Sequence, residues 1–205
     1  MGTRMRKEDG HGDSVARCEA CGTAVPGYDV VNYGSIAGGY RQLCCQCFNA
    51  EVASAQGLEH FENFRFDQVV MIDCAGEAHE FHFRTRLLGS MVAVDAFELM
   101  RGEPAGYQFR IVGDPDDDVL SLLARLVERM RRTLSVKHLV PSEHGLQIAE
   151  QTVRARIAWD ETQDERMPLL VIDGREVSWE EFGRMLMTFE GWQFRMEIGD
   201  PSEEV

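Results

Sequence analysis

The sequence lacks long apolar runs and lacks a surplus of positive charge. No stretch of about 18 consecutive apolar residues occurs, so we expect no membrane-spanning segment. The 205 residues carry 21 Lys and Arg against 35 Asp and Glu, a formal net charge of −14. Proteins that bind nucleic acid draw most of their affinity from phosphate neutralisation, so this balance argues against a nucleic-acid partner.

The acidity is concentrated in the last third of the chain. Residues 141–205 hold 6 basic and 15 acidic side chains, which is a net charge of −9. Acidic surfaces commonly serve solubility, and a basic protein partner is the alternative interpretation. The first 17 residues, MGTRMRKEDGHGDSVAR, contain no apolar segment. We therefore expect a disordered tail over residues 1–15, no secretory signal and a cytoplasmic location.

The common catalytic motifs are missing as well. The sequence has no Walker loop, no G-x-S-x-G and no G-x-G-x-x-G. The letters HEFH at residues 79–82 are one residue shorter than H-E-x-x-H, and strand alternation puts His79 and His82 on opposite faces. The acidic clusters Asp116–Asp118 and Asp160–Glu165 lack EF-hand spacing. No catalytic residues can be assigned, and the sequence names no small-molecule ligand.

Cysteine, in contrast, is abundant and clustered. Cys18-x-x-Cys21 and Cys44-x-x-Cys47 are two pairs separated by 22 residues. In a cytoplasmic chain such clustering favours metal ligation over disulfides. Two cysteines that flank a tight turn supply adjacent vertices of the tetrahedron that Zn²⁺ prefers. We predict one structural Zn²⁺ ion held by these four cysteines. Its closed shell leaves no position for substrate.

The spacing leaves Cys45 over, because pairing it with Cys47 would give a C-x-C too tight for the turn. We expect Cys45 and Cys74 to be packing residues. His60 could replace a cysteine as a zinc ligand, but the four cysteines already fill the coordination shell. A redox C-x-x-C motif requires one pair beside a βαβ unit, so two pairs argue against that interpretation.

The segments CEACG and LCCQCFNAEVA resemble the treble-clef group of zinc fingers, in which the second cysteine pair begins a helix. The resemblance covers about 40 residues and implies metal binding, not a particular function. A zinc ribbon is the close alternative, but it would require a strand where FNAEVASAQ favours a helix ending at Gly57. Treble-clef nucleases add a catalytic His near that helix, and this helix has none. The rest of the chain resembles uncharacterised bacterial-type zinc-binding proteins.

The remaining pattern predicts an α+β domain with a mainly antiparallel sheet and two amphipathic helices. Strands are predicted over HEFHFRTRLL, SMVAVDAFELM, GYQFRIVG and TVRARIAW. The sequence also predicts a strand over WQFRMEI, with Trp192, Phe194, Met196 and Ile198 facing inward. One helix is predicted from Asp114 as N-cap, with one apolar stripe at helical spacing, and another after the capping box of Ser178 and Glu181. The letters PLLVIDGREV predict a hairpin with Asp173 and Gly174 as its turn.

The predicted organisation is a zinc module over residues 16–57 followed by the α+β domain over residues 66–200. The letters GYQFRIVGDP at 106–115 return as GWQFRMEIGDP at 191–201. This echo indicates either two similar halves, residues 66–140 and 150–200, or convergence on good strand and turn chemistry.

We predict a non-enzymatic protein-interaction or regulatory protein that contains structural zinc. One alternative is nucleic-acid binding through the zinc module and the strand face with His82, Arg84 and Arg86. Another is an enzyme whose site lies in the α+β domain.

Overall fold

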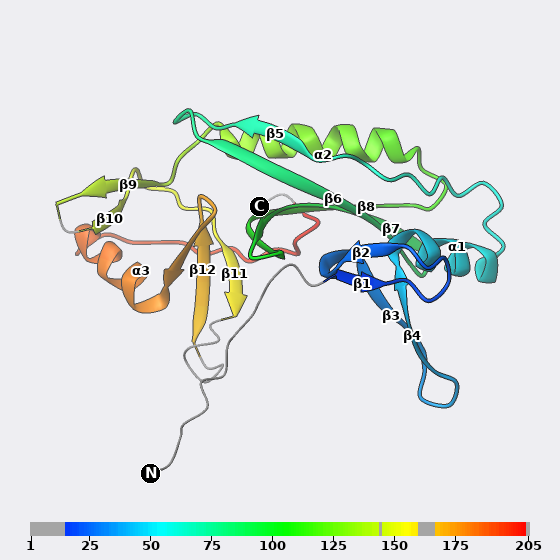
Figure 1. Cartoon of the computed structure of the whole chain (residues 1–205). Coiled ribbons are helices and arrows are strands. Elements are labelled where there is room, and N and C mark those ends of the chain that lie inside the picture. The colour runs from blue at the N-terminus through cyan, green and yellow to red at the C-terminus, as the bar shows by residue number, and fades with distance from the viewer. Residues whose placement is uncertain (1–14, 144, 160–166, 204–205) are drawn as a thin grey trace, which may run out of the picture.

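The computed structural model describes residues 15–143, 145–159 and 167–203. Within these ranges the fold is α+β, with antiparallel sheets and three α-helices (Figure 1). The predicted tail, apart from Val15, and the acidic loop Asp160–Glu165 lie outside the described residues. No helix in the described ranges combines the length and the apolarity needed to cross a membrane.

The cysteine-bearing segment forms a small module at one end of the central sheet (Figure 1). Two antiparallel hairpins and one helix build it, and the second hairpin lies between the two cysteine pairs. The elements are β1 (Val15–Arg17), β2 (Ala24–Pro26), the 3-10 turn η1 (Gly27–Asp29), β3 (Val30–Ser35), β4 (Gly39–Cys44) and α1 (Cys45–Gln56).

Helix α1 begins within the second cysteine pair, at Cys45, and continues through FNAEVASAQ, as the sequence predicts. It ends at Gly57, whose φ of 70° is left-handed and whose N–H bonds the carbonyl oxygens of Ala53 and Ser54. A residue without a Cβ adopts this conformation at no steric cost. A zinc ribbon would require a strand after Cys47, so the helix at this position argues against the zinc-ribbon alternative.

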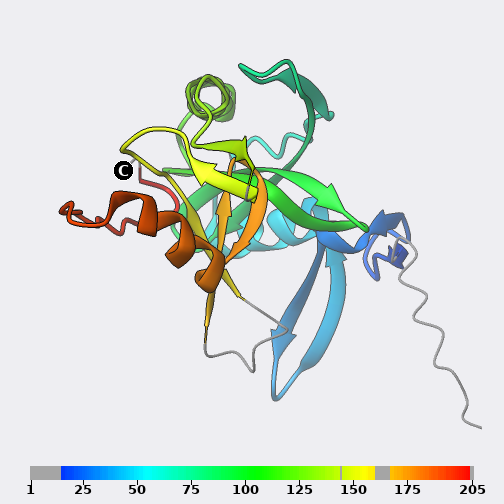
Figure 2. The ribbon, with the colours of Figure 1, turned by 90° about the vertical axis from the view of Figure 1, so that its left-hand side faces the viewer.

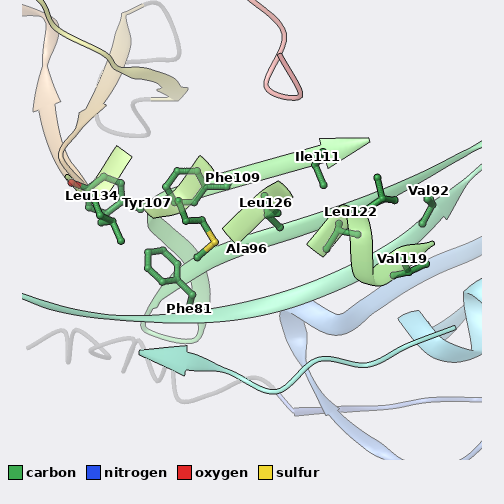
Figure 3. Close-up of a cluster of buried hydrophobic side chains, with 12 residues drawn as sticks. Phe81, Val92, Ala96, Tyr107, Phe109, Ile111, Val119, Leu122, Leu126 and Leu134 are labelled. Atoms are coloured by element: carbon green, nitrogen blue, oxygen red, sulfur yellow. The ribbon is translucent and has the colours of Figure 1, made fainter. Parts of the chain in front are cut away.

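The centre of the molecule is a four-stranded antiparallel sheet in the order β5-β6-β7-β8. Helix α2 lies along one face, and the side chains between them form the largest core cluster (Figures 1 and 3). The strands are β5 (Val69–Ile72), β6 (Ala78–Leu88), β7 (Met91–Met100) and β8 (Glu103–Gly113), and the helix is α2 (Val119–Leu134). The fully buried residues of this core cluster include Phe81, Val92, Val94, Ala96, Leu122, Leu126 and Met130.

The predicted start of α2 is wrong by four residues. The helix begins at Val119, and Asp118 caps it by accepting from the backbone N–H of Leu120. Asp114 instead closes the preceding turn, where its carboxylate accepts from the N–H of Asp116 at 3.0 Å. Several acidic residues in a row all suit a helix N-terminus, so composition alone could not select among them. The predicted apolar stripe of α2 is confirmed.

A single buried amide joins α1 to the central sheet. The Asn49 side chain donates to the carbonyl oxygen of Thr85 at 2.9 Å and accepts from the N–H of Leu87 at 2.8 Å. β5 pairs only with the first part of β6, from Ala78 to Phe81. Asn49 therefore supplies the hydrogen bonds that a neighbouring strand would give to the uncovered edge of β6.

Replacing Asn49 with alanine is expected to lower the free energy of unfolding by about 3 kcal/mol. The change leaves one buried carbonyl and one buried N–H without a partner, and each such group costs roughly 1–3 kcal/mol. Urea unfolding measures the effect. Asn32→Ala, at an exposed position of β3, is the control and should change stability by less than about 0.5 kcal/mol. Equal effects of the two variants would contradict the role of Asn49.

The C-terminal part contains a hairpin, a three-stranded antiparallel sheet and a short helix, which face the viewer in Figure 2. The turn at Asp173 and Gly174 is confirmed, with φ of 51° and 74°, as a two-residue hairpin turn requires. The predicted cap is confirmed too, because the Ser178 hydroxyl accepts from the N–H of Glu181. The elements are β9 (Leu139–Ser142), β10 (Gly145–Ile148), β11 (Arg156–Trp159), β12 (Pro168–Ile172), β13 (Arg175–Ser178), α3 (Trp179–Leu186) and η2 (Met187–Phe189).

The predicted strand over WQFRMEI is wrong. Residues 191–200 contain no strand in the structure, and every one of them is exposed. The predicted strand TVRARIAW is likewise reduced to its last four residues, β11. Both segments have the alternation of a strand, but a strand also needs a neighbour with which to pair, and sequence alternation does not specify that neighbour.

Candidate metal centre

The first cysteine pair lies in the tight turn that links β1 to β2. The N–H of Cys18 donates to the carbonyl oxygen of Thr23 at 3.0 Å, and the N–H of Gly22 donates back to Cys18 at 2.9 Å. Gly22 has a φ of 74°, which favours glycine at this point of the turn. The turn is tied to β4 because the N–H of Gln42 donates to the Glu19 carboxylate at 2.8 Å.

The second cysteine pair lies at the start of α1. The position of this helix places the second pair beside the β1–β2 turn that holds the first pair. Cys44 is the N-cap residue of α1, and Cys47 follows in the first helical turn. The four sulfur atoms all lie within 4.8 Å of one another, and Cys21 Sγ is 4.0 Å from Cys44 Sγ. Tetrahedral coordination with metal–sulfur bonds of about 2.3 Å would place sulfur atoms about 3.8 Å apart. The cluster can therefore hold one metal ion without rearrangement of the backbone.

The surroundings of the four thiols shift their pKa values in different directions. Burial raises the pKa of Cys18, but the backbone N–H groups of Cys21, Cys44 and Ala20 more than offset it and bring the pKa to about 6. Burial and the neighbouring thiols raise the pKa of Cys47. Hydrogen bonds from Thr23 lower the pKa of Cys21, and burial raises that of Cys44. Negative charge is thus favoured at the first cysteine pair and disfavoured at the second.

The other cysteines and His60 lie outside the cluster of four. Cys45 is buried, as the packing interpretation predicts, and burial together with Asp29 raises the pKa of its thiol. Cys74 is exposed in the turn after β5, so the prediction that it is a packing residue is wrong. His60 is exposed, and it is not among the residues that the structure brings to the metal centre.

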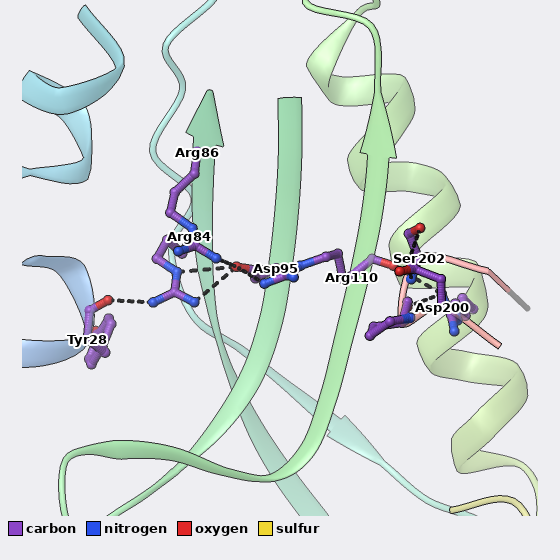
Figure 4. Close-up of polar contacts among 9 residues, drawn as sticks. Tyr28, Arg84, Arg86, Asp95, Arg110, Asp200 and Ser202 are labelled. Carbon is purple, nitrogen blue, oxygen red and sulfur yellow. Dashed lines mark hydrogen bonds and ion pairs between the residues drawn. The ribbon is translucent and has the colours of Figure 1, made fainter. Parts of the chain in front are cut away.

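A second polar cluster lies on the sheet face opposite α2 and was missed from the sequence. The carboxylate of Asp95, on β7, accepts from Arg84 at 3.0 Å, Arg86 at 3.1 Å and Arg110 at 2.6 Å (Figure 4). Burial raises the pKa of Asp95, but the three guanidinium groups more than offset it and lower the pKa. One sequence signal was available, because Asp95 is the only charged residue within the apolar run MVAVDAF.

The Asp95 cluster also joins distant parts of the chain. Arg84 donates to the backbone carbonyl of Tyr28 in η1 at 2.8 Å, which links the cluster to the cysteine module. At the other side Arg110 lies near Asp200 of the C-terminal segment (Figure 4). Arg84 and Arg86, which the nucleic-acid alternative assigns to phosphate contacts, are therefore already bonded to a buried carboxylate.

A third cluster lies at the junction of the central sheet and the C-terminal part. The His79 ring contacts two carboxylates, Glu98 at 2.8 Å through Nδ1 and Asp73 at 3.2 Å through Nε2. Lys137, just beyond α2, places Nζ 2.5 Å from Asp73 and 3.3 Å from Glu77. His79 and His82 lie on opposite faces of β6, as alternation predicts, since His82 contacts Glu80 and Tyr28 instead.

Asp73, Glu77 and His79 also have ligand atoms close enough together for a metal ion. The ammonium group of Lys137, however, already supplies the positive charge at this position. A metal ion would have to displace it from a carboxylate that is fully buried. The cluster is thus a complete ion-pair network, and it fastens the segment after α2 to the end of β5.

Replacing Asp73 with Asn is expected to flatten the loss of stability in acid. Burial raises the pKa of Asp73, but Lys137, the N–H groups of Glu77 and Ala75, and His79 outweigh it and hold the pKa well below its ordinary value. The unfolded chain then binds more protons between the two pKa values, so stability falls as pH drops toward the folded pKa. Urea midpoints measured from about pH 6 to about pH 3 should fall more steeply in the unsubstituted chain.

Asp67→Asn is the control for this experiment, because Asp67 is exposed. It should keep the steep acid dependence of the unsubstituted chain. All three proteins retain the four clustered cysteines, so acid-induced loss of a metal cancels when their midpoints are compared. Identical slopes for Asp73→Asn and the unsubstituted chain would show that this network does not contribute to acid sensitivity.

Three family models match successive segments of the chain, and each is described as a domain of unknown function. They are DUF7685 over residues 17–59, DUF7686 over residues 62–135 and DUF7713 over residues 136–203. No curated protein and no solved structure matches the chain. The first matched segment contains all four clustered cysteines, and the three descriptions name no activity.

Proposed function

We propose that the chain is a non-enzymatic protein-interaction protein whose N-terminal module is stabilised by one structural Zn²⁺ ion. Cys18, Cys21, Cys44 and Cys47 would hold the ion. Four thiolates suit Zn²⁺ and close its coordination shell, so the metal would fold the module and leave no open position for a substrate. The order of turn, hairpin and helix supports the resemblance to treble-clef fingers. The proposed units remain residues 16–57 and 66–200, with possible halves at 66–140 and 150–200.

The observation that carries the interaction role is the C-terminal strap, which we define as residues 192–198. Trp192, Phe194, Met196 and Ile198 are exposed by 63%, 76%, 56% and 74%. Single exposed apolar residues are ordinary, but contiguous apolar patches mark interaction sites. A covering protein would remove these four side chains from water. The acidic last third of the chain would add charge around such an interface.

The two alternatives gain no comparable support. Nucleic-acid binding would need free cationic side chains, but Arg84 and Arg86 are bonded to Asp95. An enzyme site would need a polar cluster that can receive a substrate. The cluster around Asp73 is instead filled by Lys137.

Site-specific photo-crosslinking tests the proposed function. A photoreactive phenylalanine analogue at Phe194, in the full chain expressed in its own cells, should form covalent adducts with protein. The same analogue at Ile36, which is exposed by 96% on the β3–β4 hairpin, is the control and should form few. If position 194 yields no protein adducts above position 36, the interaction role is wrong.

A further inference from the structure

The strap has the sequence of a strand without a strand's environment. GYQFRIVG, which forms most of β8, and GWQFRMEIG, which contains the strap, share their spacing of aromatic and aliphatic residues. In β8, the residues Tyr107, Phe109 and Ile111 belong to the core cluster with α2 and are at most 8% exposed. The corresponding side chains of the strap are more than half exposed. The same spacing of apolar side chains is thus buried in β8 and exposed in the strap.

The backbone of the strap also lacks hydrogen-bond partners among the described residues. Among the described residues, none of the backbone groups from 193 to 199 forms a hydrogen bond within the chain. Both ends are nevertheless fixed. The N–H of Trp192 donates to Phe189 at 2.9 Å, and Arg129 of α2 donates to the carbonyl oxygens of Pro201 and Glu203. An extended segment held at both ends, with free N–H and C=O groups, is a template for strand pairing.

A free sheet edge of the same character lies elsewhere in the C-terminal part. Among the described residues, β11 is the outer strand of the sheet β11-β12-β13 and pairs only with β12. Ile157 and Trp159 on this strand are exposed by 57% and 61%. Arg156 forms no ion pair within the described residues, and its Nε is buried without a hydrogen-bond partner. Within the described residues this edge therefore lacks a neighbouring strand and apolar cover, and the carboxylate near Arg156 is that of Glu176, two strands away.

We propose that the strap of one copy pairs with β11 of a second copy, and that two copies exchange this contact reciprocally. In an antiparallel register with Glu197 opposite Arg156, Met196 lies opposite Ile157 and Phe194 opposite Trp159. This one register pairs apolar with apolar residues and acid with base, as cross-strand neighbours prefer. The inference rests on the proposed function, since it names the partner of the same segment.

The exposed apolar area approaches that of a standard interface. The four apolar side chains of the strap together with Ile157 and Trp159 are all more than half exposed. Aromatic side chains bury roughly 150–250 Å² each, so the exposed parts of Trp159, Trp192 and Phe194 offer about 400 Å² per copy, to which Met196, Ile198 and Ile157 add. Specific interfaces bury about 800 Å² per partner. The reciprocal exchange closes on itself with two-fold symmetry and so gives a dimer, not an open polymer.

Sedimentation velocity of the full chain between about 1 and 100 μM tests the proposal. The expected result is a dimer that Phe194→Asp and Ile157→Asp each convert to monomer. Ile36→Asp, an equally drastic change at an exposed residue of the hairpin, should leave the dimer intact. A monomer at all concentrations, or a dimer that survives both strap and β11 variants, overturns the proposal.

A charge exchange tests the register. Arg156→Glu and Glu197→Arg should each weaken the dimer about tenfold, because like charges then face each other. The double variant should restore the original dissociation constant. No restoration would overturn this register.

The outcomes separate this inference from the proposed function. Adducts at position 194 that have twice the chain mass and map to β11 support both. Adducts with a different protein, or strap amides protected from hydrogen exchange in a monomeric chain, overturn the second copy as partner. Only the absence of any protein adduct overturns the interaction role itself.

Discussion

Removal of the metal is expected to unfold the cysteine module while the central sheet and the C-terminal part stay folded. A module of about 40 residues buries too little apolar surface to fold alone, and structural Zn²⁺ contributes about 10–16 kcal/mol of apparent binding free energy in comparable peptides. Hydrogen exchange after chelation, or in Cys44→Ser, should show loss of protection over β3 and β4. The N–H of Leu87 should also exchange faster, because its acceptor is Asn49 of α1.

Cys45→Ser is the matched control for metal removal, since Cys45 is the neighbour of Cys44 and lies outside the cluster of four. It should retain the protection of the β3–β4 hairpin. Full protection of the hairpin after chelation would mean that the module folds without metal. Equal loss of protection in Cys44→Ser and Cys45→Ser would mean that packing, and not ligation, is the common cause.

Asp95→Ala is expected to lower the free energy of unfolding by about 3–5 kcal/mol. The variant leaves three guanidinium groups close together without their shared carboxylate, and removing one partner of a buried ion pair has this cost. Arg84 would also lose part of the geometry that places it against the Tyr28 carbonyl. Urea unfolding at neutral pH measures the change, and the docking of η1 on the sheet should weaken in parallel.

Two further variants separate charge from shape at this position. Asp95→Asn keeps the size of the side chain and removes its charge, so it should lose most of the same stability. Asp67→Ala removes an exposed carboxylate and should change stability by less than about 0.5 kcal/mol. A loss below about 1 kcal/mol in Asp95→Ala would show that the arginines find other partners or solvent at little cost.

Much of the fold follows from local sequence patterns. The spacing of the cysteines predicts the two turns that the structure brings together, because a C-x-x-C turn has few alternative shapes. The apolar stripe of α2, the turn at Asp173 and Gly174, and the cap at Ser178 are also local, and the structure confirms them. In each case the physical cause lies within a few residues of the feature.

The features that the sequence did not reveal depend on partners far along the chain. The sequence around Asn49 predicts an ordinary helix residue, and only the structure shows its hydrogen bond to the edge of β6. Asp95 and Lys137 gain their roles from residues on other elements. The alternation of the strap predicts a buried strand, and only the surrounding structure shows that the described part of the chain leaves its apolar side chains exposed.

Native mass spectrometry of the full chain tests the metal centre most directly. The unsubstituted chain and Cys45→Ser should each carry one zinc ion per chain, and Cys47→Ser should have lost it. Retention of zinc by Cys47→Ser, or a metal-free unsubstituted chain after purification without chelators, would contradict the four-cysteine centre on which the proposed module depends.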